Sequence, residues 1–255
     1  MNLEAYARTD AGPARETNED SMLVDLENQL FIIADGMGGC ASGEVASAMA
    51  VDALQRILVS EQEDPDQTRL VRNDEYMERS DELRELLRYG MNQASIAIRK
   101  HMELNPETRG MGTTVVVLVF ESDRAHVAHV GDSRAYLVRD GRLNPLTRDH
   151  TVVQQEIDAG RLTPELARLV PHKHILTQSV GFHGPVEPDT STRVLNHGDL
   201  FIMCSDGLTD VMDDADILRV STQNPPDMVA DALVEEALAK GTNDNVTAVV
   251  VSCLQ

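Results

Sequence analysis

The sequence contains no tryptophan, and aromatic residues make up only 3 % of its 255 residues. Its three cysteines stand far apart and show no Cys-x-x-Cys spacing. An odd number of scattered cysteines argues against a disulfide framework and against a structural zinc site. With so few aromatic rings there is also little surface on which the bases of a nucleic acid could stack. We expect a core of aliphatic side chains and a reducing, cytoplasmic location.

Basic residues are scarce as well, with 22 Lys and Arg against 43 Asp and Glu and a net charge of -21. Such a charge repels nucleic acid and anionic lipid. No apolar run reaches the roughly 18 residues of a membrane span, and the first residues lack a signal-peptide pattern. We expect neither nucleic acid nor membrane as a partner. Most of the acidic excess should form solvated surface, and a smaller share could be buried around metal ions.

The hydrophobic pattern predicts strands, two long consecutive helices, more strands, and then helices before a final strand. Because the long helices do not alternate with strands, the order favours antiparallel sheets with helices stacked outside them over a βαβ array. Residues 61–74 are polar and predict a surface loop. We expect strands at 21–25, 30–34, 113–120, 124–130, 133–139, 142–146, 200–204 and 246–252, and helices at 42–60, 81–104, 152–159, 213–220 and 228–239.

Aspartates recur where apolar strands begin or end. Asp35, Asp132 and Asp206 follow such strands, Asp244 precedes one, and the pair Glu19-Asp20 leads into another. Each alone is ordinary turn chemistry. Antiparallel sheets, however, bring strand ends from distant sequence onto one edge, where several carboxylates repel one another unless a cation lies among them. Oxygen ligands without cysteine suit Mg²⁺ or Mn²⁺ better than zinc.

Neighbouring residues support an ion site that handles phosphate. Gly36 leaves its carbonyl free to approach a metal. Arg15 could grip two phosphoryl oxygens through its guanidinium, or it could be a surface arginine. Thr113 could bond a carboxylate of a neighbouring strand, or it could be an ordinary strand residue. Cys204 is expected to be a small buried side chain with no nucleophilic role, and the same holds for Cys40.

Six motifs occur in one order along the chain and resemble those of the metal-dependent protein phosphatase 2C (PP2C) family, in its bacterial stand-alone form. The resemblance covers about residues 8–252. The motifs are Arg15-x-x-Asn18-Glu19-Asp20, Asp35-Gly36-Met37-Gly38-Gly39, Met111-Gly112-Thr113-Thr114, Val130-Gly131-Asp132-Ser133-Arg134, Cys204-Ser205-Asp206-Gly207-Leu208 and Asp244-Asn245-Val246-Thr247.

The resemblance implies an α+β fold, a sandwich of two mainly antiparallel sheets with a pair of helices on each outer face. It implies one PP2C-type domain over residues 1–255, with a flap at about 147–184 beside the site, and a monomer. The flap carries His150, His172, His174 and His183. The implied activity is hydrolysis of phosphoserine and phosphothreonine in proteins, opposing a bacterial serine/threonine kinase.

The resemblance also implies roles for single residues. Two Mn²⁺ or Mg²⁺ ions would be held, with Asp35 bridging them, Asp20 and the Gly36 carbonyl on one, and Asp206 and Asp244 on the other. Asp132 with Asp206 would hold a third ion, and Arg15 would bind the phosphate. Asp35 and Arg15 would therefore be catalytic. Glu19, Thr113 and Asn245 would lie just behind the ligands.

Two ions about 4 Å apart would lower the pKa of a shared water so that it attacks phosphorus in line, without a phosphoenzyme. The sequence departs from some animal members at Met37, where they carry a histidine proposed to protonate the leaving group. Here that proton would come from a metal-bound water, or from His150 or another flap histidine.

Three other interpretations compete. The run from Gly36 to Ala41 matches a dinucleotide-binding fingerprint in form, but Asp35 would face the pyrophosphate and the second parallel strand is missing, so we reject it. A non-catalytic binding module of the same fold would have lost its aspartates, and here they are present. A phosphodiesterase or small-molecule phosphatase stays open, and comparing a phosphopeptide with a mononucleotide would separate it.

Overall fold

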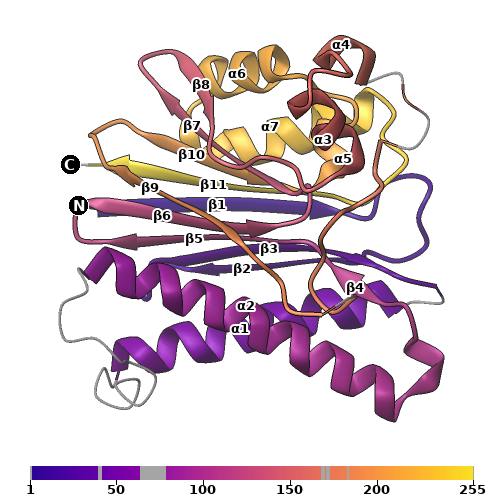
Figure 1. The fold of residues 1–255 in the computed structure, drawn as a ribbon. Helices are drawn as coiled ribbons and strands as arrows, with labels where there is room; N and C mark the ends of the chain where they lie inside the picture. Colours follow the sequence, from indigo (N-terminus) through magenta and orange to yellow (C-terminus); the bar gives the residue numbers. More distant parts are fainter. Residues whose placement is uncertain are drawn as a thin grey trace.

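The computed structural model describes residues 2–39, 42–63, 79–167, 170, 173–182 and 184–254. Two antiparallel sheets pack face to face, and helices cover both outer faces (Figure 1). This is the α+β sandwich expected from the resemblance, and the prediction of fold class is confirmed.

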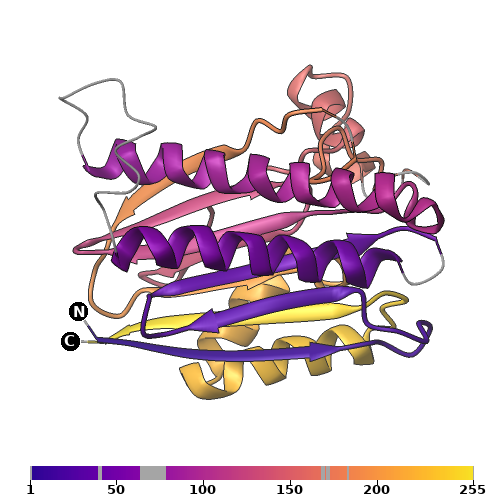
Figure 2. The same cartoon turned by 90° about the horizontal axis from the view of Figure 1, so that it is seen from below.

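The first sheet carries both long helices on its outer face, α1 (Ser42–Glu63) and α2 (Arg79–Leu104), which lie side by side (Figure 2). A short strand, β4 (Gly112–Thr113), pairs with the end of β3. The strand order is β2 (Asp20–Asp25), β3 (Leu30–Met37), β5 (Val115–Glu121), β6 (Arg124–Val130) and β9 (Asp189–Val194).

The second sheet is covered by α6 (Asp214–Gln223) and α7 (Pro226–Ala239). A single helical turn, α5 (Asp206–Thr209), follows its central strand directly. The strand order is β1 (Asn2–Asp10), β11 (Val246–Leu254), β10 (Leu200–Cys204), β7 (Arg134–Arg139) and β8 (Arg142–Pro145).

Aliphatic side chains fill three layers of core. Along β3, Leu30 and Ile32 face the helices α1 and α2, whereas Phe31 and Ile33 face the other sheet, as the two-residue period of a strand requires. The third layer lies between the second sheet and its helices. Burial on both faces makes β3 and β10 rigid supports, so the aspartates at their ends are held in fixed positions.

Most expected elements are present within two or three residues of their predicted bounds. Asp140 and Gly141 both have positive φ, 53° and 69°, as the predicted two-residue hairpin between β7 and β8 requires. The first long helix continues to Glu63, so residues 61–63 are helical and the predicted loop there is wrong. The rest of the predicted loop, residues 64–74, lies outside the described residues.

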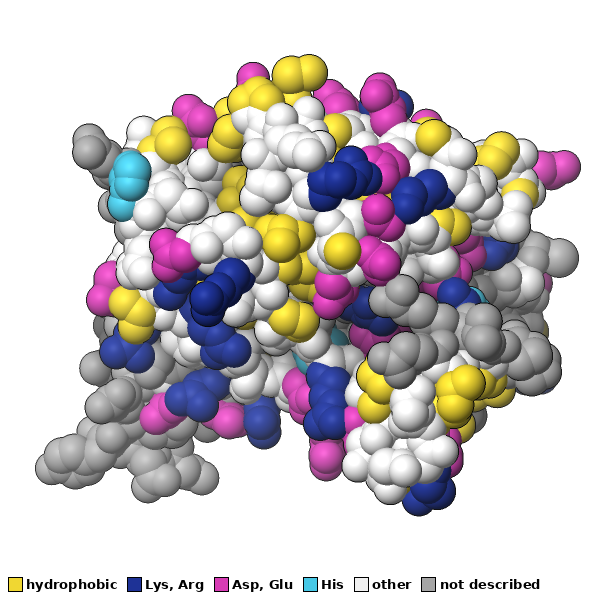
Figure 3. Space-filling view, turned by 90° about the horizontal axis from the view of Figure 1, so that it is seen from above, with side chains coloured by type: hydrophobic (Ala, Val, Ile, Leu, Met, Phe, Trp, Pro, Cys, Tyr) yellow, Lys and Arg dark blue, Asp and Glu magenta, His cyan; other side chains and the backbone are white. Residues whose placement is uncertain are grey.

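Between β8 and β9 the chain leaves the sheets and forms the short helices α3 (Val152–Asp158) and α4 (Pro164–Ala167). This is the segment expected to be the flap. Among the described residues, no helix combines the length and the apolar character that crossing a membrane requires. The face in Figure 3 mixes acidic and basic side chains, so the acidic excess is not gathered into one block there.

Candidate functional site

Strand ends from both sheets meet at one edge of the sandwich, around a cleft of about 190 Å³. Seven of the residues expected in the site line it, together with other residues of the motifs and of the flap. Its lining consists of Arg15, Glu19, Asp35, Gly36, Met37, Gly38, Thr114, Asp132, His174, Leu176, Asp206 and Asp244.

Asp20 lies at the start of β2, opposite Asp35 of β3 in the ladder. Its Oδ2 accepts hydrogen bonds from Ser205 Oγ at 2.8 Å and Thr247 Oγ1 at 2.6 Å. Its Oδ1 is buried and has no partner among the described residues. Burial raises the pKa of Asp20 to about 7, and these two hydrogen bonds oppose the shift. A buried carboxylate oxygen without a donor is a natural place for a cation.

Asp35 is fixed through its backbone. Its N–H donates to Thr114 Oγ1 at 3.1 Å, and its carbonyl accepts from Thr113 Oγ1 at 2.9 Å. The expectation that Thr113 bonds a carboxylate is therefore wrong, because its hydroxyl lies against the backbone carbonyl of the ligand strand. Burial raises the pKa of Asp35 well above its usual range, and Asp206, Asp20 and Asp132 add to the shift through repulsion.

Asp132 follows β6 and is 7 % exposed. Burial, and then repulsion from Asp206, raises its pKa well above the ordinary value. Asp206 begins α5, so its carboxylate stands at the end of buried β10. Burial acts to raise the pKa of Asp206, but hydrogen bonds from His174 and Asp35 outweigh it and lower the pKa. Its Oδ1 has no partner among the described residues.

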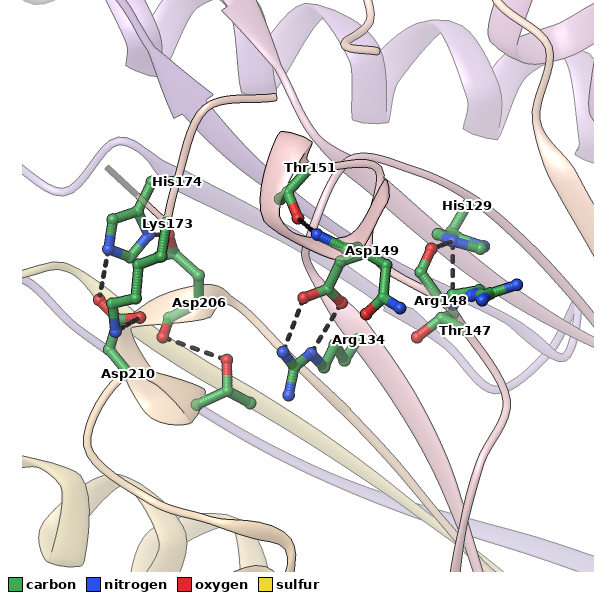
Figure 4. Close-up of polar contacts among 12 residues, drawn as sticks. His129, Arg134, Thr147, Arg148, Asp149, Thr151, Lys173, His174, Asp206 and Asp210 are labelled. Atoms are coloured by element: carbon green, nitrogen blue, oxygen red, sulfur yellow. Dashed lines mark hydrogen bonds and ion pairs between the residues drawn. The ribbon is translucent and has the colours of Figure 1, made fainter. Parts of the chain in front are cut away.

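His174, one of the four flap histidines named from the sequence, contacts this cluster. Its Nδ1 lies 3.3 Å from Asp206 Oδ2 and its Nε2 lies 3.4 Å from Asp210 Oδ2 (Figure 4). The hydrogen bond with Asp206 raises the pKa of His174. Asp132, His174 and Asp206 offer ligand atoms that all lie within 4.8 Å of one another. The sequence offered little reason to choose His174 over the other flap histidines, because only its position in the flap marked it as a candidate.

Two glycines allow the backbone segments around the site to pack closely. A Cβ on Gly36 would lie 2.1 Å from the Gly43 carbonyl oxygen, and one on Gly207 would lie 2.0 Å from the Asn245 carbonyl oxygen. No side chain fits at either distance. Glycine at position 36 therefore lets the end of β3 contact the start of α1, and Gly207 lets α5 contact the loop before β11.

Arg15 and Glu19 line the cleft together with Asp244. Arg15 Nη2 contacts Asp244 Oδ2 at 2.8 Å. Asn245 is buried, and its side chain joins three backbone groups, accepting from Glu19 N–H and donating to the carbonyls of Ala11 and Thr17. Asn245 thereby ties the loop that carries Arg15 and Glu19 to the loop that carries Asp244.

The other histidine considered from the sequence, His150, is packed away from the cleft lining described above. Its ring stacks on His129 with centroids 4.7 Å apart, and its Nδ1 accepts from the Gly131 N–H at 3.3 Å. His172 and His183 lie outside the described residues, as does Cys40. Cys204 is fully buried, and burial raises the pKa of its thiol to about 12, which fits the packing role expected for it.

The donors suit a hard cation. They are carboxylates and a backbone carbonyl, and two of the carboxylate oxygens are buried without a partner among the described residues. Burial, and then repulsion among the acids, raises the pKa of Asp35 and of Asp132. Binding of Mg²⁺ or Mn²⁺ would give these oxygens a partner and would neutralise the repulsion among the acids. A carboxylate cluster at the edge of the sandwich, next to an arginine, is suited to hold metal ions beside a phosphate group.

The chain belongs to the protein phosphatase 2C family, whose model matches residues 14–240. The serine/threonine protein phosphatase PstP of Mycobacterium tuberculosis is 37 % identical over 248 residues, which cover 97 % of this chain and 44 % of PstP. The chain thus spans less than half the length of that relative. The protein phosphatase PhpP of Streptococcus pneumoniae is 35 % identical over 258 residues, 98 % of this chain and 97 % of PhpP. The resemblance expected from the motifs is confirmed.

A solved structure of the PstP catalytic domain in complex with two manganese ions is similar over the whole fold. The TM-score is 0.81 at 36 % identity, and the match covers 99 % of each chain. The ions in that relative agree with the hard-cation character of the cluster described here.

Proposed function

We propose that the chain is a metal-dependent serine/threonine protein phosphatase of one domain, 1–255, with a flap at about 147–184. The observation that carries the proposal is the cleft in which Asp35, Asp206 and Asp244 face Arg15, within a fold shared with named protein phosphatases. Its substrates are phosphoserine and phosphothreonine in proteins, and it opposes a serine/threonine kinase. It works as a monomer in the cytoplasm.

The residues divide the work as follows. Asp35 would be shared between two Mn²⁺ or Mg²⁺ ions, Asp20 and the Gly36 carbonyl would help to hold one of them, and Asp206 and Asp244 would help to hold the other. When bound, such ions lower the pKa of a coordinated water toward neutrality. Arg15 orients the phosphoryl group through two N–H donors. Glu19, Thr113 and Asn245 hold the ligands in place through the contacts described above.

A third, weaker cation is proposed at Asp132 and Asp206, with His174 as a further ligand. The close approach of their ligand atoms supports this assignment. The imidazole would give up its proton when it binds the ion. Titration of the metal-free protein with Mn²⁺ by calorimetry tests it. Wild type should show one more weak binding step than His174→Ala, and identical isotherms would remove His174 from the site.

The activity is tested by phosphate release from a phosphothreonine peptide with Mn²⁺ and then with excess EDTA. We expect release that EDTA stops, and little release from a matched phosphotyrosine peptide or from a mononucleotide. Activity on the mononucleotide alone would favour a small-molecule phosphatase. No release from any ester by folded protein would favour a binding module and contradict the proposal.

A further inference from the structure

A closed circuit of hydrogen bonds begins and ends at Asp20. The N–H of Asp20 donates to Asn18 Oδ1 at 3.1 Å, and Asn18 Nδ2 donates to Thr9 Oγ1 at 2.8 Å. Thr9 Oγ1 lies 2.7 Å from Thr247 Oγ1, which in turn donates to Asp20 Oδ2 at 2.6 Å. Thr9 and Thr247 stand opposite each other in the ladder between β1 and β11. The circuit therefore joins the backbone of Asp20 to its own carboxylate through the second sheet.

The chemistry of the groups fixes the direction of every bond in this circuit. An ionised carboxylate only accepts, so the hydroxyl of Thr247 gives its single proton to Asp20. In the contact between the two threonines, Thr9 must then be the donor. The lone pairs of Thr9 are left to accept from the side-chain amide of Asn18, whose nitrogen only donates. Because all the bonds run one way, each polarises the next, and every member is satisfied.

The circuit treats the two oxygens of Asp20 differently. Oδ2 accepts from Thr247 and also from Ser205 Oγ at 2.8 Å. Oδ1 is buried and has no partner among the described residues. Rotation of the carboxylate would break both bonds to Oδ2. The two hydroxyls thus hold Asp20 in one orientation, in which Oδ1 stays available as a cation ligand.

We infer that Thr247 and, through it, Thr9 are positioning residues, which hold the carboxylate of Asp20 in the orientation that binds a divalent cation. The inference rests on the metal centre of the proposed function. Neither threonine lines the cleft, so neither is placed to touch the substrate. Thr247 is fully buried, whereas Thr9 is exposed at the edge of the second sheet and lies outside the six motifs. Their loss should weaken cation binding, because the carboxylate would be free to turn.

Calorimetric titration of the metal-free protein with Mn²⁺ tests the inference without any turnover. Thr247→Val keeps the shape of the side chain and removes the hydroxyl, so we expect the affinity of one Mn²⁺ step to fall about tenfold. Thr9→Val should lower it only about threefold, because water can replace an exposed hydroxyl. Thr247→Ser keeps the donor and should restore the affinity of wild type.

The double variant Thr9→Val/Thr247→Val tests whether the two threonines act as one unit. Since Thr9 acts only through Thr247, the double variant should bind Mn²⁺ about tenfold more weakly than wild type, as Thr247→Val does alone. A loss equal to the product of the two single losses would show independent effects and would overturn the circuit.

Thr192→Val is the matched control. Thr192 is also a strand threonine whose hydroxyl makes a side-chain contact, 3.2 Å from His126 Nδ1, but it lies on β9 and does not line the cleft. This variant should bind Mn²⁺ as wild type does. Unchanged affinity in Thr247→Val, or an equal loss in Thr192→Val, would overturn the inference.

Kinetics at rising Mn²⁺ concentration then separates positioning from general damage to the fold. At saturating Mn²⁺, Thr247→Val should regain the kcat of wild type for a phosphothreonine peptide within about twofold, with an unchanged KM. A kcat that stays low at saturating Mn²⁺ would contradict a role in cation affinity alone. If wild type binds no Mn²⁺, or binds it and cleaves no phosphopeptide, the proposed function fails instead.

Discussion

The guanidinium of Arg15 contacts the carboxylate of Asp244, with 2.8 Å between Nη2 and Oδ2. The residue proposed to bind phosphate thus lies on a residue proposed to bind a metal ion. This hydrogen bond raises the pKa of Arg15. Because both a cation and Arg15 compensate the charge of Asp244, cation binding should free Arg15 to turn toward a phosphoryl group.

Arg15→Ala should separate these two effects. We expect the KM for a phosphothreonine peptide to rise about tenfold, because a bidentate charged contact is lost. The affinity for Mn²⁺ should stay equal or increase, since a competing positive charge has gone. Steady-state kinetics and calorimetric Mn²⁺ titration measure the two quantities.

Arg15→Lys is the matched control, since it keeps the charge without the planar fork. It should retain normal Mn²⁺ affinity and recover only part of the peptide KM. An unchanged KM in Arg15→Ala would remove Arg15 from the phosphate role.

Asp206→Asn should abolish turnover while the fold stays intact. The amide is similar in shape to the carboxylate but binds cations poorly, so at least one Mn²⁺ should be lost in calorimetry and activity should fall by about a thousandfold or more. Asp214→Asn is the control, because Asp214 is an exposed aspartate in the first turn of α6. Near-normal activity in Asp206→Asn would show the ligand assignment to be wrong.

Much of this site could be predicted from the sequence, because a buried strand is visible there as an apolar run whose end can be located. The apolar runs before Asp35 and Asp206 become β3 and β10, fully buried along most of their length. Their register leaves the aspartates at one edge. Two strands that the sequence did not predict, β9 and β1, are not continuous apolar runs. β9 is polar and partly exposed at the edge of its sheet, and β1 is nowhere fully buried.

Contacts between side chains that are distant in the sequence could not be predicted in the same way. The motif residues Ser205 and Thr247 were visible, but only the pairing of β10 with β11 shows that both hydroxyls serve Asp20. His174 stands near Asp206 because the flap folds back onto α5. Neither local propensity nor periodicity encodes that return, since the flap has little regular structure.

Gly36→Ala tests the close contact between β3 and α1. A methyl group 2.1 Å from the Gly43 carbonyl must displace backbone, so we expect a loss of about 2 kcal/mol or more and reduced Mn²⁺ affinity. Gly39→Ala is the matched control, since a Cβ there meets no atom of the described residues within 4 Å. Thermal unfolding of both variants checks this. Equal melting temperatures would mean that the backbone relaxes at no cost.

The last prediction concerns pH and the metal-free protein. The pKa of Asp20 is raised by burial from 3.8 to about 7 in the folded state. Its contribution to stability is complete below the unfolded pKa and is lost as pH rises through the folded one. Without metal, wild type should therefore lose stability between about pH 4 and pH 8 relative to Asp20→Asn, whose amide oxygen still accepts from Ser205 and Thr247.

Melting temperatures in EDTA at about pH 5 and pH 8 measure this difference. At the higher pH, Asp20→Asn should melt roughly 5 °C above wild type. Saturating Mn²⁺ should reverse the order, because only the carboxylate gains from the ion. Asp214→Asn should follow wild type throughout. If Asp20→Asn instead melts below wild type in EDTA at both pH values, the buried carboxylate stabilises the fold by itself, and the idea that it awaits a cation is wrong.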